Sequence, residues 1–353
     1  MIGVELFAGA GGMSLGAQQA GIDVKLAVEI DPHAAATYHC NHPEVRLLTQ
    51  DIRDISLADL PTTTDSTILF GGPPCQGFST SNQRTRNKEN SNNWLFAEFL
   101  RITKIWKPNW VVFENVRGIV DTEGGMILAK VKAGFEKHGY TLTEWILNAA
   151  DYGVPQRRSR YFLIGSRDGI QVLKPLPTTA KPISVGEAIG DLPRLTSGTL
   201  KEQLPYRSKA VSCYASELRN GSKYSLNNLV TKNSALVLER YNHIPQGGNW
   251  QDIPAELMSS YTDASRCHTG IYHRLQNKTE SVVLGNYRKN MLVHPTQNRG
   301  LSVREAARLQ SFPDYFEFKG SIGYQQQQVG NAVPPLLAHA VFTSIIVSAG
   351  LSD

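Results

Sequence analysis

The chain has 353 residues, of which 41% are hydrophobic and 19% charged, and this balance is typical of globular rather than disordered proteins. The formal net charge of +5 permits a polyanionic partner without requiring one. No run approaches the roughly 20 apolar residues of a membrane span, and the N-terminus lacks the features of a signal peptide, so we expect a cytoplasmic protein. The cysteines are few and scattered and form no Cys-x-x-Cys pair, so we predict neither a disulfide framework nor a metal site.

Residues 1–165 alternate short β-branched runs with helical patterns, which is the signature of a mostly parallel, doubly wound α/β sheet with helices on both faces. The predicted strands are 2–7, 25–29, 46–48, 67–70, 110–114, 140–147 and 160–164. The predicted helices are 13–20, 33–39, 95–106 and 126–138, and they have the length expected of crossover connections.

Beyond Lys174 the pattern changes to prolines and long polar stretches with weak periodicity, which predicts a second, smaller and irregular domain. Helices are predicted again at 302–311 and 334–349, and the last is too hydrophobic to stand alone, so we expect it to pack on the first domain. The predicted organisation is a first domain at 1–175, a second domain at 176–290, a hinge and bracing helix at 291–322, and a returning C-terminal segment at 323–353.

One cysteine follows a stiff corner directly after a predicted strand. Residues 71–80 read Gly-Gly-Pro-Pro-Cys-Gln-Gly-Phe-Ser-Thr. The two prolines fix their own backbone and bias the residues before them toward extended geometry. We therefore expect the thiol of Cys75 to point into a cleft, although an ordinary buried cysteine on a connecting turn is the alternative.

A glycine turn follows the first predicted strand. Ala8-Gly9-Ala10-Gly11-Gly12 leads into a helix, and such a turn lets backbone N–H groups approach a ligand closely. The next strand ends in Glu29-Ile30-Asp31, where an acid would bind a ribose, and Asp51-Ile52 follows the third strand. Simple strand–helix packing is the alternative. Ser14 stands where a dinucleotide site would have its third glycine, which disfavours a nicotinamide enzyme.

An acid and two arginines are predicted at the same edge of the sheet as Cys75. The strand 110–114 ends in Glu114, and alternation along the segment before 160–164 places Arg158 and Arg160 on one face. A nucleophilic thiol, a carboxyl group and two guanidinium groups would then converge. A structural ion-pair network is the alternative interpretation of these charges.

Together these segments resemble the cytosine-C5 DNA methyltransferase family of the bacterial restriction-modification type, along nearly the whole chain. The matching motifs occur in the family's usual order: 7–12 (FAGAGG), 73–76 (PPCQ), 114–116 (ENV), 156–160 (QRRSR), 304–313 (REAARLQSFP) and 328–334 (QVGNAVP). The resemblance implies a Rossmann-like methyltransferase fold, with a target recognition domain at 176–290.

The family's chemistry implies a role for each predicted catalytic residue. Cys75 would add to C6 of a cytosine, so that C5 can attack the sulfonium methyl of S-adenosylmethionine and leave S-adenosylhomocysteine. Glu114 would hydrogen-bond N3 and the exocyclic amino group of the base, while Arg158 and Arg160 would hold O2. The arginines would also favour the thiolate of Cys75.

The resemblance also implies ligand-binding residues. The residues expected to bind the cofactor are Phe7, Gly9, Ala10, Gly11, Gly12, Glu29, Ile30, Asp51, Ile52, Pro74, Leu95, Asn331 and Val333. Ile30 replaces an aromatic residue often found beside the acid. The target base must be flipped out of duplex DNA to reach a thiol, and the expected DNA contacts lie in a closing loop: Gln76, Ser79, Ser81, Arg84 and Arg86.

The resemblance implies a nucleoid-associated monomer that binds neither a metal nor a membrane. A restriction endonuclease would be its functional rather than physical partner. Arg304, Glu305 and Arg308 are expected to brace the two domains instead of contacting bases.

Two alternative functions remain. A transfer RNA methyltransferase shares the catalytic motifs, but the sequence has no Cys-Phe-Thr tripeptide. An inactive DNA-binding paralogue is opposed by intact Cys75, Glu114 and Arg158.

Overall fold

The computed structural model describes residues 1–74, 95–259 and 269–351. The chain forms two compact units. Unit 1 comprises Met1–Tyr152, Ser159–Thr178 and Val333–Asp353, and unit 2 comprises Gly153–Arg158 and Thr179–Ala332. Three separate stretches of chain therefore build unit 1, and each unit is described below by itself.

Unit 1 is built on a seven-stranded sheet with the order β3-β2-β1-β4-β5-β7-β6. The first five strands pair in parallel, and β7 is antiparallel to both β5 and β6. The predicted doubly wound, mostly parallel sheet is thereby confirmed. The strands are β1 (Ile2–Leu6), β2 (Asp23–Val28), β3 (Arg46–Leu48), β4 (Thr67–Gly71), β5 (Trp110–Val116), β6 (Thr141–Asn148) and β7 (Ser159–Ser166).

The chain reverses its winding direction between β1 and β4, which lie next to each other in the sheet. Leu6, the last residue of β1, pairs with Gly71, the last residue of β4. The glycine turn after β1 and the Pro-Pro corner after β4 therefore leave the sheet side by side. In open α/β sheets, ligands bind at such a switch point, beyond the carboxyl ends of the strands.

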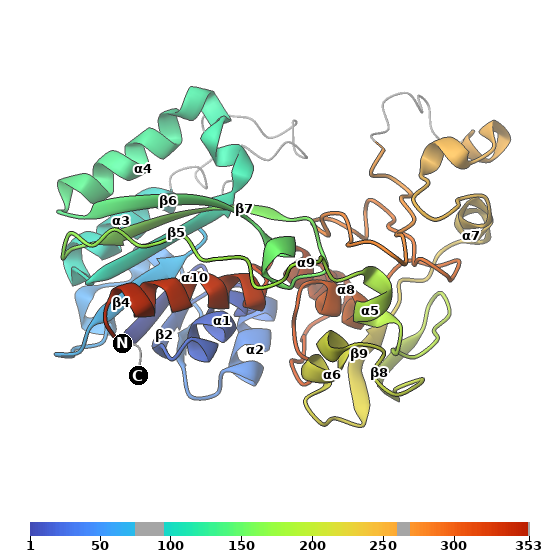
Figure 1. Ribbon diagram of the computed structural model, residues 1–353, viewed down its shortest axis with the longest axis horizontal. Coiled ribbons are helices and arrows are strands. Elements are labelled where there is room, and N and C mark those ends of the chain that lie inside the picture. The colour runs from blue at the N-terminus through green and yellow to red at the C-terminus, as the bar shows by residue number, and fades with distance from the viewer. Residues whose placement is uncertain (75–94, 260–268, 352–353) are drawn as a thin grey trace. The chain divides into compact units, whose positions relative to one another are not determined.

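Helices cover both faces of this sheet (Figure 1). On one face lie α3 (Leu95–Trp106) and α4 (Met126–Lys137), whose buried side chains join those of the strands in one core cluster. On the other face lie α1 (Gly12–Gln19), α2 (Pro32–Asn41) and α10 (Pro335–Ser348). Among its described residues, the unit also has short 3-10 helices at Ile52–Asp54, Leu57–Asp59, Arg117–Val120, Thr122–Gly125 and Ala149–Tyr152.

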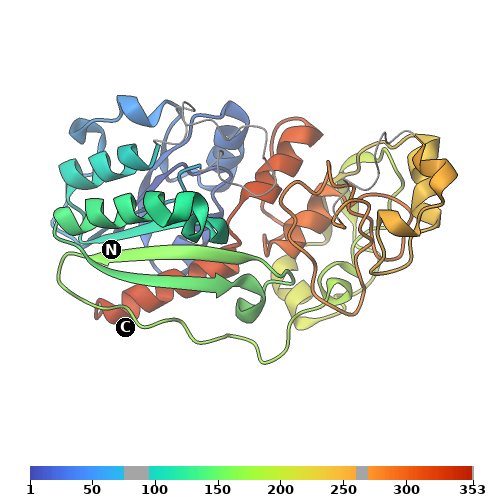
Figure 2. The same ribbon diagram turned by 90° about the horizontal axis from the view of Figure 1, so that it is seen from above.

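Helix α10 packs closely against α1. Figure 2 shows from above that the red C-terminal helix runs along the sheet. A Cβ atom at Gly16 of α1 would lie 2.6 Å from Cβ of Ala338, so only glycine permits this approach. The ring of Phe342 stacks edge-on against Phe70 of β4. By length and composition alone Ile322–Ser348 could cross a membrane, but 61% of its most apolar window is buried inside the protein, as is usual for a core helix.

Unit 2 contains short elements joined by long irregular segments. Its helices are α5 (Val185–Ile189), α6 (Cys213–Arg219), α7 (Ala235–Asn242), α8 (Val303–Leu309) and α9 (Ile322–Asn331), with 3-10 helices at Trp250–Asp252 and Ala255–Met258. Its strands β8 (Leu200–Pro205) and β9 (Tyr224–Leu229) form an antiparallel pair.

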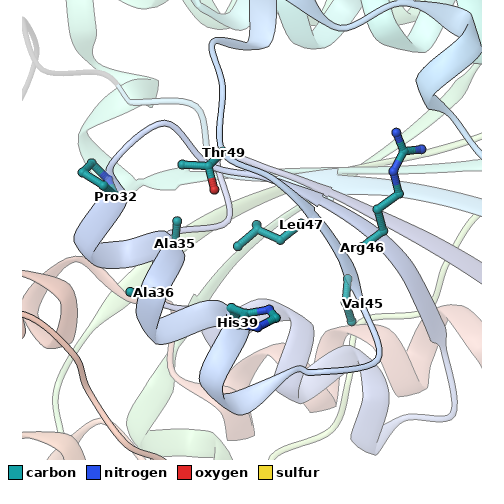
Figure 3. A pocket seen from close by; sticks show the side chains of 8 residues that line it. All are labelled: Pro32, Ala35, Ala36, His39, Val45, Arg46, Leu47 and Thr49. Atoms are coloured by element: carbon teal, nitrogen blue, oxygen red, sulfur yellow. The ribbon is translucent and has the colours of Figure 1, made fainter.

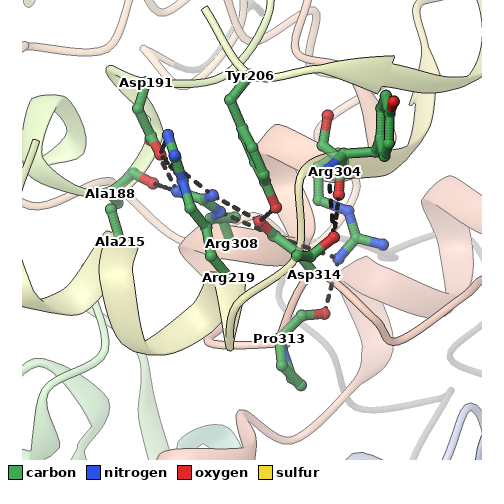
Figure 4. Close-up of polar contacts among 12 residues, drawn as sticks. Ala188, Asp191, Tyr206, Ala215, Arg219, Arg304, Arg308, Pro313 and Asp314 are labelled. Atoms are coloured by element: carbon green, nitrogen blue, oxygen red, sulfur yellow. Dashed lines mark hydrogen bonds and ion pairs between the residues drawn. The ribbon is translucent and has the colours of Figure 1, made fainter. Parts of the chain in front are cut away.

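Buried charges connect the segments of unit 2 (Figure 4). Arg308 of α8 binds Asp191 at 2.9 Å and Asp314 at 2.6 Å, and all three side chains are fully buried. Arg304 donates to the carbonyl oxygens of Leu226 and Pro313. These partners all belong to unit 2, and the bracing of two domains by this helix stays a prediction. Since a buried guanidinium group needs several acceptors, α8 orders the loops around it.

Lys107 is an exposed residue held in the left-handed conformation, with φ of 51°, directly after α3. Its N–H donates to the carbonyl oxygen of Thr103 and ends the helix. Glycine adopts this conformation without strain, so we expect Lys107→Gly to raise the free energy of unfolding by about 0.5–1 kcal/mol. Lys107→Ala, which keeps a Cβ atom, should give no such gain. Thermal and urea unfolding of both variants would measure the difference, and equal stabilities would contradict the strain.

Candidate active site

The Pro-Pro corner is fixed against the end of β5. The side-chain amide of Asn115 donates to the carbonyl oxygen of Pro73 at 3.1 Å. A Cβ atom at Gly72 would lie 2.5 Å from Oε2 of Glu114, so a larger residue here would displace this carboxyl group. The chain is thus directed past Glu114 immediately before Cys75. The sequence motif 114–116 includes Asn115, but its position in the sequence did not predict the hydrogen bond to Pro73.

Glu114 forms a buried ion pair with Arg160. The Nε atom of Arg160 lies 2.9 Å from Oε1 of Glu114, and the two side chains are only 10% and 9% exposed. Strands β5 and β7 are antiparallel, with Val116 opposite Arg160, so Glu114 and Arg160 are diagonal neighbours on one face. Burial lowers the pKa of Arg160, and Glu114 opposes this shift. An ordered acid and a desolvated cation therefore lie beside the corner.

Arg158 has different partners. It belongs to unit 2, where its Nη2 atom donates to the carbonyl oxygens of Gly330 at 2.8 Å and Ala332 at 3.0 Å. Its side chain is buried, at 1% exposure. These contacts fix the backbone on both sides of Asn331, a residue expected to bind the cofactor. Arg160 therefore pairs with Glu114, whereas Arg158 binds the backbone of the segment around Asn331.

The glycine turn after β1 uses left-handed backbone conformations. Phe7, Gly9 and Gly11 have φ values of 58°, 55° and 89°, and a positive φ is uncommon for a phenylalanine. The N–H of Gly9 donates to Oε2 of Glu29 at 2.7 Å, and the N–H of Asp31 donates to Oε1 of the same carboxylate at 2.7 Å. Burial raises the pKa of Glu29. The acid predicted at the end of the second strand thus contacts the turn itself.

The neighbouring residues expected at this edge differ in exposure. The Ile30 side chain is 62% exposed at the end of β2, whereas Ile52 is buried. Asp51 binds Arg53, with the Nε atom of Arg53 at 2.9 Å from Oδ1, and these side-chain bonds lower the pKa of Asp51 to about 2. Ile30 therefore offers an apolar surface, and Asp51 is a carboxylate held in place by an arginine.

The other expected site residues are distributed as follows. Pro74 ends the described corner, Leu95 begins α3, and Val333 begins the last stretch of unit 1, whereas Asn331 ends α9 in unit 2. Six of the predicted residues lie outside the described residues: Cys75, Gln76, Ser79, Ser81, Arg84 and Arg86. Their roles stay predictions.

A buried polar cluster lies beneath the glycine turn. The hydroxyl of Ser14 donates to Glu5 of β1 and lies 2.6 Å from the hydroxyl of Tyr38. His42 packs against Tyr38 and makes a 3.2 Å contact with the carbonyl oxygen of Gly11 through Nε2. Burial lowers the pKa of His42 to about 4. The serine that replaces a third glycine therefore joins β1, α1 and α2 under the turn.

Glu5 should make stability depend on pH. Burial raises its pKa from 4.5 to about 8, so Glu5 stays neutral in the folded protein while the unfolded chain ionises. Its contribution to stability is complete below pH 4.5 and is lost as pH rises toward 8, by at most about 1.4 kcal/mol per pH unit. Glu5→Gln should remove this loss. In urea unfolding, the free energy of unfolding of the variant minus that of the native protein should increase by about 2 kcal/mol from pH 5.5 to pH 7.5. Parallel pH profiles of the two proteins would contradict the role of Glu5.

An open pocket of about 460 Å³ lies between α2 and the edge strand β3 (Figure 3). It is lined by Pro32, Ala35, Ala36, His39, Val45, Arg46, Leu47 and Thr49. None of the residues expected to bind the cofactor lines it. The pocket is therefore separate from the glycine turn and the Pro-Pro corner. Among the described residues, no group of three or more His, Cys, Asp or Glu side chains is placed to hold a metal ion.

The doubly wound sheet, with a glycine turn at its switch point and an acid after the neighbouring strand, defines a Rossmann-like methyltransferase fold. A solved protein described as a DNA modification methyltransferase encoded within a prophage of Escherichia coli has the same fold, with a TM-score of 0.81, 26% identity and 99% of each chain covered. The methyltransferase EhMeth of Entamoeba histolytica shares the fold at 14% identity, with a TM-score of 0.65 over 100% of this chain and 99% of its own.

The family model of C-5 cytosine-specific DNA methylases matches residues 1–347, so the chain belongs to this family of enzymes. Among curated relatives, the type II methyltransferase M1.HphI of Haemophilus parahaemolyticus is 38% identical over 348 residues, which cover 97% of this chain and 86% of the relative. The type II methyltransferase M.XorII of Xanthomonas oryzae is 36% identical over 367 residues, covering 96% of this chain and 83% of the relative. The resemblance found in the sequence motifs is thereby confirmed.

Proposed function

We propose that this protein is a sequence-specific DNA methyltransferase that transfers a methyl group from S-adenosylmethionine to C5 of a cytosine in duplex DNA. The single observation that carries the proposal is the buried Glu114–Arg160 pair, 2.9 Å apart, beside the corner that leads to Cys75. Family membership over residues 1–347 supports the same activity.

The residues of the glycine turn fit the cofactor. A Cβ atom at Gly9 would meet nothing within 4 Å, so there is open space above the turn. The Glu29 carboxylate at the turn is suited to accept hydrogen bonds from ribose hydroxyls, and the exposed side chain of Ile30 is suited to pack on an adenine. When bound, S-adenosylmethionine supplies an electrophilic methyl group to the substrate carbon.

The chain's own residues would activate a base that is otherwise a poor nucleophile. The thiolate of Cys75 would add to C6, which makes C5 enamine-like. C5 would then bond to the methyl carbon as the sulfur–methyl bond breaks, with S-adenosylhomocysteine as the leaving group. A base then removes the C5 proton, the C5–C6 double bond re-forms, and the thiolate leaves. Glu114 hydrogen-bonds N3 and the exocyclic amino group, and Arg160 holds O2 while remaining paired with Glu114. Arg158, also assigned to the pocket, holds the backbone on both sides of Asn331.

The substrate assigned to this site is duplex DNA with one cytosine flipped out of the stack, because a stacked base cannot reach a thiol on the protein. We assign DNA contacts to the segment after Cys75, through Gln76, Ser79, Ser81, Arg84 and Arg86, and target reading to residues 176–290. The protein would act as a cytoplasmic, nucleoid-associated monomer, and a restriction endonuclease would cleave the same sequence when it is unmethylated.

The proposal is tested by incubating the full-length protein with methyl-labelled S-adenosylmethionine and either duplex DNA or transfer RNA. Hydrolysis to nucleosides should recover the label as 5-methyldeoxycytidine, and bisulfite sequencing of a plasmid should place it in one short sequence. Label in RNA but not in DNA would overturn the choice of substrate. Label on an exocyclic nitrogen would contradict methylation at C5. Cofactor binding without turnover on any DNA would favour an inactive paralogue.

A further inference from the structure

Helix α3 binds the turn that follows β3 through one arginine. Arg101 donates from Nη1 to the carbonyl oxygen of Ile55 at 2.8 Å and from Nη2 to that of Ile52 at 2.9 Å. Its Nε atom donates to Glu98 of the same helix at 2.6 Å. The planar guanidinium group thus has three partners, and two of them are backbone atoms of one short turn.

This turn carries residues expected to bind the cofactor. Asp51 caps the 3-10 helix Ile52–Asp54 through the N–H of Arg53, and the side chains of Ile52 and Ile55 are buried in the core with Phe99 of α3. Helix α3 begins at Leu95, another expected cofactor residue, less than two turns before Arg101. Arg101 therefore sets the separation between the Asp51–Ile52 side of the cofactor site and its Leu95 side.

The charges around the turn support the same arrangement. Glu98 pairs with Arg101 and also attracts the exposed Arg53 guanidinium group, which in turn binds Asp51. Acid and base thus alternate from Asp51 through Arg53 and Glu98 to Arg101. A lysine in place of Arg101 would keep the charge, but a single ammonium group lacks the fork that reaches two carbonyl oxygens at once.

We propose that Arg101 is a positioning residue for the methyl-donor site, acting through the backbone of Ile52 and Ile55 without contacting the cofactor. The inference rests on the proposed function, because it assigns Asp51, Ile52 and Leu95 to cofactor binding. A turn released from α3 would no longer hold Asp51 and Ile52 in register with Leu95. Cofactor binding would weaken, while the chemical step at the base, which uses Glu114 and Arg160, would be unaffected once the cofactor is bound.

The test compares Arg101→Gln and Arg101→Lys with a matched control in the same helix. Trp106 also anchors this segment to α3, donating from Nε1 to the carbonyl oxygen of Pro61 at 3.0 Å, but it holds the chain after the turn has ended. Trp106→Phe removes that bond and keeps an aromatic ring. Dissociation constants for S-adenosylhomocysteine are measured by calorimetry, and KM and kcat by label transfer to duplex DNA, all well below the melting temperature of each variant.

Arg101→Gln is expected to raise the dissociation constant and the KM for S-adenosylmethionine about tenfold or more, with kcat at saturating cofactor within about twofold. Arg101→Lys should recover part of this loss, and Trp106→Phe should lower the melting temperature without changing either constant. Unchanged affinity in Arg101→Gln, or an equal loss in Trp106→Phe, would overturn the inference. If the unmodified protein itself bound no S-adenosylhomocysteine, the proposed function would fail instead.

Discussion

Replacing Cys75 by alanine is expected to abolish methyl transfer to duplex DNA, to below about one part in 10⁴ of the native rate. Without the thiolate no adduct forms at C6, and C5 of an unactivated cytosine does not attack a sulfonium methyl group at a measurable rate. The glycine turn and Glu29 are unchanged in this variant, so binding of S-adenosylhomocysteine should persist. Label transfer and calorimetry on the same preparation measure the two properties separately.

Cys213→Ala is the control for this variant. Cys213 is an exposed cysteine at the start of α6, and its removal should leave the rate of methyl transfer within about twofold. Residual transfer by Cys75→Ala at more than a few per cent of the native rate would show that another group activates the base. Loss of cofactor binding in Cys75→Ala would show that the variant is misfolded.

Replacing Arg160 by methionine should lower both stability and activity. Glu114 would be left buried without its ion-pair partner, which typically costs about 3–5 kcal/mol. The base would also lose a positive group at O2, and removing one such electrostatic contact typically costs about 10²–10³ in rate. Urea unfolding and label transfer at saturating cofactor measure the two effects.

The double variant Glu114→Gln with Arg160→Met separates the two effects. Because both charges are removed together, much of the lost stability should return. The rate of methyl transfer should stay as low as that of the less active of the two single variants. Lys132→Met is the matched control, since Lys132 pairs with Glu144 at 2.5 Å with side chains 35% and 40% exposed. It should cost less than about 1 kcal/mol and leave activity unchanged. Recovered activity in the double variant would contradict the assigned roles.

The central strands of the unit 1 sheet were predictable because they are buried almost throughout. A strand covered on both faces is a continuous apolar run, and the segment 67–70 before the Gly-Gly-Pro-Pro corner is a clear case. The predicted ranges 46–48 and 95–106 match β3 and α3 residue for residue. In α3 the apolar face repeats at helical spacing, and Pro108 prevents the helix from continuing.

Unit 2 was far less predictable, and its buried arginines explain why. Arg274 donates to the carbonyl oxygens of Ile244, Tyr241 and His294, and Arg304 and Arg308 hold other loops in a similar way. In a sequence, arginines that bind distant carbonyl oxygens look like ordinary surface residues. Segments organised by such contacts have no hydrophobic period, so apart from the helix at 302–311 the sequence predicted only an irregular region there.

In the candidate site, too, some contacts could be predicted from the sequence and others could not. Glu29 was predicted at the same sheet edge as the glycine turn, because parallel strands that end at one edge bring their next residues together. Its hydrogen bond from the N–H of Gly9 was not predicted. The bonds from Asn115 to Pro73 and from Arg101 to Ile52 and Ile55 had no signal, since a side chain that binds a backbone carbonyl oxygen places no demand on the residue type of its partner. Arg158 and Arg160 were predicted as a pair from alternation, but the structure gives them separate partners.

The covalent adduct between Cys75 and cytosine is tested most directly by trapping it. In a duplex that carries 5-fluorocytosine in place of cytosine, the fluorine at C5 cannot leave as a proton, so the thiolate cannot be expelled after methyl transfer. With S-adenosylmethionine present, we expect a denaturation-resistant one-to-one complex, with the modified peptide containing Cys75 in mass spectrometry and no complex in Cys75→Ala. Normal methylation of cytosine without any trapped complex, or a complex that persists in Cys75→Ala, would contradict the account.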